Sequence, residues 1–106
     1  MITETDIQKF ERDGAVCLRG VFAEWIPTLQ KGVARHLENP SDSALTHKYD
    51  GHDGIFVEDF CCWESIPEYT DFVRNSPLGE IAAKLMRSTT AQFFHCLLYT
   101  SDAADE

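Results

Sequence analysis

The stretch SPLGEIAAKL, residues 76–85, carries the clearest structural pattern of this 106-residue chain. Four apolar residues recur at the helical spacing i, i+3, i+4, i+7 and therefore share one face: Leu78, Ile81, Ala82 and Leu85. Ser76 followed by Pro77 predicts where this helix begins, because Ser caps helix N-termini and Pro suits the first helical position. An amphipathic helix of this kind needs a neighbouring layer to cover its apolar face.

The rest of the chain predicts further helices and a few strands around this element. Thr3 and Asp6 have the spacing of a capping box, and Asp13-Gly14 is expected to end the first helix. Two more helices are expected over residues 24–38 and 67–74. Strands are expected over Ala15–Arg19, Ile55–Asp59 and Thr89–His95, with a polar loop from Ser41 to Gly54. This order predicts an α+β fold with few strands for its helical apolar surface.

Composition narrows the range of partners. The formal net charge is −9, and the nine Lys and Arg residues are scattered singly, which argues against nucleic acid or an anionic membrane. No apolar run approaches the roughly 20 residues of a membrane helix, and the N-terminus lacks the features of a signal peptide. A cytoplasmic location is the expectation, and Cys17, Cys61 and Cys62 are expected to be reduced, the adjacent pair as small buried residues.

Candidate chemical groups are few. The run from His47 to Gly54 holds two His and two Asp, but its spacing matches no metal motif and favours a solvated loop. Glu58 and Asp59 are expected on opposite faces of a strand, which disfavours a joint catalytic role. His36, near the end of a predicted helix, suits the helix dipole and is assigned no chemistry.

The last eleven residues, CLLYTSDAADE (Cys96–Glu106), resemble a translated sequencing adapter of the transposase-end type. We therefore expect residues 1–95 to be the native part of one domain and residues 96–106 to be a non-native tail.

Four segments of the native part, in order and spacing, resemble the phytanoyl-CoA dioxygenase family of iron(II)/2-oxoglutarate-dependent oxygenases. They are FERDGAVCLRGVF (Phe10–Phe22), FVEDFCCWESIPEY (Phe56–Tyr69), SPLGEIAAKLM (Ser76–Met86) and AQFFH (Ala91–His95). The resemblance implies N-terminal helices followed by a double-stranded β-helix, or jelly roll, here incomplete. It also implies hydroxylation of a small organic substrate with Fe(II) and 2-oxoglutarate as cofactors of the full-length protein.

The family's iron ligands, a His-x-Asp and a distant His, would lie downstream of His95, as would the Arg or Lys that pairs with 2-oxoglutarate. No catalytic or metal-binding residue is therefore assigned within this chain, and the chain alone is expected to be inactive. Phe93 and His95, on one face of their expected strand, are candidates for lining the substrate pocket. Two alternatives stay open: a small non-catalytic binding or interaction domain, and a metal-binding module built on His47 and His52.

Overall fold

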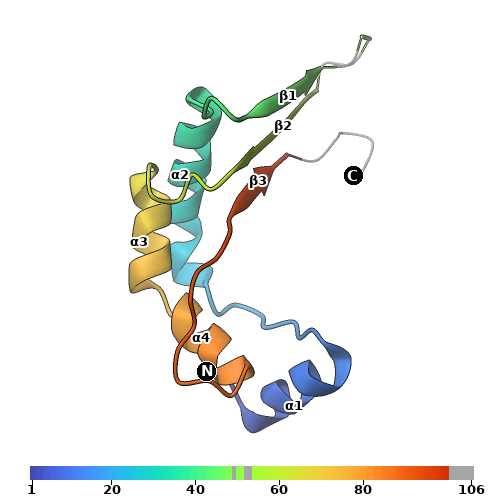
Figure 1. The fold of residues 1–106 in the computed structure, drawn as a ribbon, viewed down its shortest axis with the longest axis vertical. Helices are drawn as coiled ribbons and strands as arrows, with labels where there is room; N and C mark the ends of the chain where they lie inside the picture. Colours follow the sequence, from blue (N-terminus) through green and yellow to red (C-terminus); the bar gives the residue numbers. More distant parts are fainter. Residues whose placement is uncertain (49, 52–53, 101–106) are drawn as a thin grey trace.

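The computed structural model describes residues 1–48, 50–51 and 54–100 of the chain. Within them, four α-helices and a three-stranded antiparallel sheet confirm the expected α+β class (Figure 1). The elements are α1 (Glu4–Asp13), the 3₁₀ turn η1 (Ala23–Trp25), α2 (Ile26–Glu38), β1 (Leu45–Lys48), β2 (Ile55–Phe60), α3 (Pro67–Asn75), α4 (Leu78–Leu85) and β3 (Leu97–Tyr99).

The sheet has the order β1-β2-β3, with β2 in the centre. Leu45 pairs with Glu58 across the β1–β2 hairpin, and Asp59 pairs with Leu98 across β2–β3. Because side chains alternate along a strand, Asp59 and Leu98 share one face, and Glu58 points to the other. The described residues place no further strand on the outer edges of β1 and β3.

The helices form two pairs (Figure 1). Beside the sheet α2 packs on α3, and Arg35 of α2 makes a bidentate ion pair with Glu68 of α3 at 2.8–3.1 Å. At the end of the molecule away from the sheet α1 lies beside α4, where the Arg87 guanidinium bridges Glu4 and Glu11. The capping box predicted for α1 is confirmed, since Thr3 and Asp6 exchange hydrogen bonds of 3.0 and 3.2 Å.

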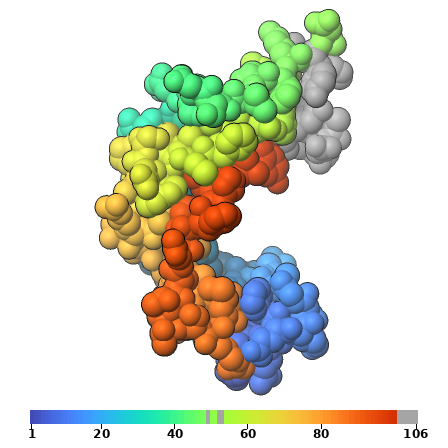
Figure 2. All heavy atoms as spheres, viewed as in Figure 1, coloured from blue at the N-terminus to red at the C-terminus, as the bar shows by residue number. Residues whose placement is uncertain are grey.

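Little of the apolar surface is buried. Among the described residues the buried hydrophobic side chains are Cys62, Ile66 and Ala83. The accessible surface is 7990 Å², whereas a compact protein of this mass exposes about 6,000 Å². The radius of gyration is 16.3 Å, against about 13 Å for a compact domain of this length. The space-filling view accordingly shows an arc that is open on one side, with the segment between α4 and β3 along its inner wall (Figure 2).

Four local expectations are wrong. Ala15–Arg19 and Thr89–His95 are not strands, because neither segment has a neighbouring strand to pair with. The Ser41–Gly54 loop contains β1, whose polar sequence pairs with β2 through backbone hydrogen bonds. Of the two adjacent cysteines only Cys62 is buried, because Cys61 turns outward with a positive φ of 58° at the end of β2.

None of the described helices combines the length and the apolar composition needed to cross a lipid bilayer.

The close approach of α2 and α3 depends on Gly32, and we predict that Gly32→Ala destabilises the chain. A Cβ at this position would lie 2.8 Å from the Tyr69 ring and 3.0 Å from Glu68 Cβ, so the helices must separate. The expected cost is roughly 1–3 kcal/mol, despite the higher helix propensity of Ala. Urea unfolding followed by circular dichroism at 222 nm measures this cost.

The matched control is Gly79→Ala in α4, where a Cβ would meet nothing within 4 Å. This variant is expected to be as stable as the unmodified chain or more stable, by roughly 0.5 kcal/mol. Equal effects of the two substitutions would contradict the close packing of α2 on α3.

Candidate functional site

A buried polar cluster lies where α2, β2 and α3 meet. The side chains of His36 and Asp59 are 3% and 0% exposed. His36 Nε2 lies 2.8 Å from Asp59 Oδ2, and His36 Nδ1 lies 3.1 Å from the Tyr69 hydroxyl oxygen. Because a carboxylate can only accept, Nε2 is assigned as the protonated, donating nitrogen of the ring.

Each residue reaches the cluster from a different element. His36 lies in the last turn of α2, and Asp59 is the penultimate residue of β2 on the face that turns toward that helix. Tyr69 lies in the first turn of α3, which begins at Pro67. The proline fixes the start of α3, so that Tyr69 projects across Gly32 toward His36.

Asp59 also anchors the chain that leaves α2. Its carboxylate accepts hydrogen bonds from the Ser41 backbone N–H at 2.8 Å and from the Ser41 hydroxyl at 2.5 Å. The Phe60 N–H donates to it at 3.0 Å. In the part of the chain that the structure describes, no buried side-chain nitrogen or oxygen lacks a partner. The cluster is therefore a fully satisfied network rather than a strained one.

The protonation states result from these contacts. Burial raises the pKa of Asp59, but the hydrogen bonds from Ser41 and His36 outweigh burial, and the net pKa lies well below the ordinary carboxyl value. Burial raises the pKa of Tyr69 to about 12. At neutral pH the cluster thus holds a carboxylate and a neutral phenol. Tyr69 is suited to hydrogen bonding and not to acting as a phenolate nucleophile.

Cys62 adjoins this network. Its side chain is buried, and its thiol donates to the Phe60 carbonyl with a sulfur–oxygen distance of 3.3 Å. Burial raises the pKa of this thiol, and the neighbouring Asp59 raises it further. One potential ligand atom each of His36, Asp59 and Cys62 lies within 4.8 Å of the others, which makes these residues the candidate metal ligands of the described chain.

An apolar groove opens beside the cluster. Its volume of about 320 Å³ is at the small end of ligand-binding cavities. The cluster forms part of one wall, and the remaining walls come from α2, α3 and the segment that leads into β3. The lining residues are Leu29, Val33, His36, Asp59, Trp63, Tyr69, Phe72, Val73, Phe93, Cys96, Leu97 and Leu98.

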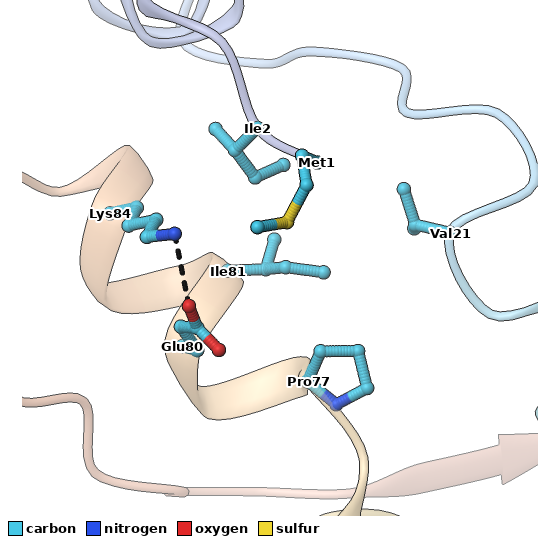
Figure 3. Close-up of a pocket in the computed structure, with 7 residues that line it drawn as sticks. All are labelled: Met1, Ile2, Val21, Pro77, Glu80, Ile81 and Lys84. Atoms are coloured by element: carbon cyan, nitrogen blue, oxygen red, sulfur yellow. Dashed lines mark ion pairs between the residues drawn. The ribbon is translucent and has the colours of Figure 1, made fainter.

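A second pocket, of about 170 Å³, lies between the N-terminus and α4 (Figure 3). Met1, Ile2, Val21 and Ile81 turn their apolar side chains toward it. Its charged residues, Glu80 and Lys84, pair with each other at 2.9 Å. With both charges engaged on the helix surface, this pocket offers no free group for chemistry.

The two pocket residues expected from the sequence lie in different places. Phe93 lines the groove and packs edge-to-face on Trp63, with ring centroids 5.4 Å apart. His95 is not among the lining residues. Its ring stacks near Phe60 at 6.4 Å, and its Nδ1 lies 3.3 Å from Cys61 Sγ.

Of the alternative metal-binding module built on His47 and His52, the structure describes only His47. His47 is exposed on β1, and its ring lies 5.6 Å from the Phe56 ring. His52 and Asp53 lie outside the described residues. Among the described residues of this segment, no His or Asp belongs to a cluster of three potential metal ligands.

The sequence interpretation missed the cluster that the fold assembles. It assigned no chemistry to His36 and treated Asp59 only as a neighbour of Glu58. The pattern of the strand gives no clear signal, because apolar residues lie on both faces, Ile55 and Val57 on that of Asp59 and Phe56 and Phe60 on the other. Nothing in the sequence identified His36 or Ser41 as a partner of Asp59.

Comparison with known proteins gives no match to a family model, a curated protein or a solved structure. The function of this cluster and groove is therefore inferred from their own chemistry.

We predict that Asp59→Ala destabilises the chain by roughly 3 kcal/mol. The substitution leaves the Ser41 and Phe60 donors and the His36 ring without their acceptor in a buried position. Glu58→Ala is the matched control on the opposite face of β2 and is expected to change stability by less than about 0.5 kcal/mol. Urea midpoints of the two variants test this difference; similar midpoints would contradict it.

Asp59 also predicts a pH dependence. Because its pKa is lowered in the folded state, its contribution to stability is complete above the unfolded-state pKa of about 4 and is lost as pH falls through the lower folded-state pKa. The stability difference between the unmodified chain and Asp59→Asn should therefore narrow as pH is lowered below about 4. Unfolding curves recorded from neutral pH to about pH 2 measure this difference, and a constant gap would argue against a depressed pKa.

Proposed function

We propose that this chain is the N-terminal part of an iron(II)/2-oxoglutarate-dependent oxygenase that hydroxylates a small organic substrate. The observation that carries the proposal is the uncovered apolar surface of an otherwise well-formed α+β unit. Ile26 and Leu37 of α2 and Leu45 and Ile55 of the sheet are each 40–52% exposed. Such surface is normally covered by the rest of a domain.

The arrangement of the sheet supports the same proposal. In a double-stranded β-helix, further strands would pair with the outer edge of β1 and with the edge of β2 that β3 of the tail occupies here, and a second sheet would cover the exposed side chains. The groove beside Phe93 would then become one wall of an enclosed substrate cavity. Its mostly apolar lining suits a small organic molecule, and the Tyr69 hydroxyl offers a polar contact.

The described residues do not supply the iron site of this family. The family's metal motif needs a His-x-Asp, whereas His36 and Asp59 are 23 residues apart and bind each other directly. The third potential ligand is a cysteine and not a second histidine. Iron and 2-oxoglutarate are therefore assigned to sequence beyond His95, and no catalytic step is assigned to residues of this chain.

The proposal includes a cytoplasmic setting and a small-molecule partner, with no role for nucleic acid or membrane. The described cysteines are free thiols. Four of the nine basic residues, Arg12, Arg35, Lys84 and Arg87, form ion pairs with acids of the same chain, and the other five are scattered along the sequence, which disfavours a polyanion as partner.

A small non-catalytic binding domain is the second candidate, and the groove itself favours it. A cavity of about 320 Å³ with a buried hydrogen-bonding cluster in its wall could hold a ligand without any iron chemistry. The two candidates differ in the sequence that the gene encodes after His95.

The deciding prediction is made on the source DNA. A single unbroken read across the His95 codon is expected to continue in frame into a His-x-Asp and a later His. If the genome instead encodes CLLYTSDAADE followed by a stop codon, the oxygenase proposal fails and the binding domain becomes the better account.

A second prediction concerns the 106-residue protein itself. In an anaerobic titration we expect no stoichiometric Fe(II) binding that depends on 2-oxoglutarate, because the ligands of both are assigned downstream. The positive control is the protein extended to its genomic stop codon, which should bind Fe(II) and 2-oxoglutarate together and convert 2-oxoglutarate to succinate. One equivalent of iron held by the short chain only in the presence of 2-oxoglutarate would contradict the assignment.

A further inference from the structure

Three metal-ligating side chains converge inside the described fold, and the proposed oxygenase function uses none of them as ligands. His36 Nε2 or Nδ1, an Asp59 carboxylate oxygen and Cys62 Sγ lie within 4.8 Å of one another, and all three side chains are buried. They come from α2, from β2 and from the turn after β2. We propose that His36, Asp59 and Cys62 bind a zinc ion.

The donor set selects the class of metal. A thiolate and an imidazole favour Zn²⁺ over Mg²⁺ and Ca²⁺, which prefer all-oxygen sites. Bond lengths of about 2.0–2.3 Å in a tetrahedral zinc site place ligand atoms about 3.3–3.7 Å apart. His36 Nε2 and Asp59 Oδ2, now 2.8 Å apart, need to separate by only about half an ångström. Cys62 Sγ, within 4.8 Å of both, needs to approach them by roughly 1 Å.

The residues behind the ligands suit this role. A zinc-bound Nε2 must give up its proton, so the ring must carry its proton on Nδ1 instead. Tyr69 permits this exchange, because its hydroxyl at 3.1 Å from Nδ1 can accept as well as donate. The Ser41 hydroxyl and the Phe60 N–H hold Asp59 Oδ1, and the Ser41 backbone N–H donates to Oδ2 at 2.8 Å. These three contacts fix the carboxylate, and the second lone pair of Oδ2, which now accepts from His36, would turn to the metal.

Charge balance points the same way. Without a cation Cys62 remains a neutral thiol beside the Asp59 carboxylate. Zn²⁺ would displace the thiol proton, and its two positive charges would balance the thiolate and the carboxylate. Three protein ligands leave one tetrahedral position for water, and His36 and Asp59 already line the apolar groove through which it would enter. The proposal does not depend on the oxygenase assignment, since every residue involved lies between positions 36 and 69, upstream of the tail.

The test uses Co²⁺ in place of Zn²⁺, because cobalt–thiolate coordination absorbs in the near ultraviolet and zinc is silent. Under reducing conditions the 106-residue chain should bind one equivalent of Co²⁺ with a thiolate charge-transfer band that Zn²⁺ abolishes. Cys62→Ser should lose the band. Cys61→Ser, which changes the adjacent exposed cysteine, should keep it, as should a chain in which Cys17, Cys61 and Cys96 are all replaced by Ser.

Tyr69→Phe provides a second measurement that keeps all three ligands. It should retain the band but weaken metal affinity about 10-fold to 100-fold, as loss of a group behind a ligating His does. Absence of the band in the unmodified chain, or its persistence in Cys62→Ser, would overturn the proposal. Neither result bears on the DNA sequence after His95, so a failure here is separate from a failure of the oxygenase proposal.

Discussion

The carboxylate of Asp59 holds together the part of the molecule formed by the sheet, α2 and α3. It joins β2 to α2 through His36 and to the chain after α2 through Ser41, and His36 in turn joins α3 through Tyr69. In most small domains apolar packing makes such connections, and polar groups occupy the periphery. Here two buried titratable side chains, His36 and Asp59, make them, and among the described residues only three hydrophobic side chains are buried.

A fold joined in this way has consequences for its shape. Hydrogen bonds between buried groups are directional and fix the angle between helix and sheet, but they stabilise less than the burial of large apolar side chains. The Arg35–Glu68 and Arg87–Glu4 pairs add directional contacts at the surface, where ion pairs contribute little. The elements can therefore be well formed while the molecule stays open, as its arc-shaped outline shows (Figure 2).

The sequence predicted those parts of the fold that depend on neighbours along the chain. The Thr3–Asp6 capping box and the helices near residues 26–38, 67–75 and 78–85 come from local patterns, and the structure confirms them. Strands depend on pairing as well as on propensity. Ala15–Arg19 has strand propensity but no partner strand, whereas β1 has mostly polar residues and forms by pairing with its hairpin partner β2. The buried cluster could not be predicted, because its three elements come together only when the chain folds. No spacing within the chain indicates that His36 is the neighbour of Asp59.

The third strand, β3, forms mainly because of residues that precede His95. β3 lies in the segment that resembles an adapter, yet it pairs in register with β2, and the Cys61 N–H donates to the Cys96 carbonyl at 2.9 Å. This pairing uses backbone groups, which any sequence can supply except at proline. The approach is set upstream, where Phe93 packs on Trp63 and directs the chain along the groove. Residues 1–95 thus offer an unpaired edge of β2 and an apolar wall beside it, and a strand can form there with little demand on its own side chains.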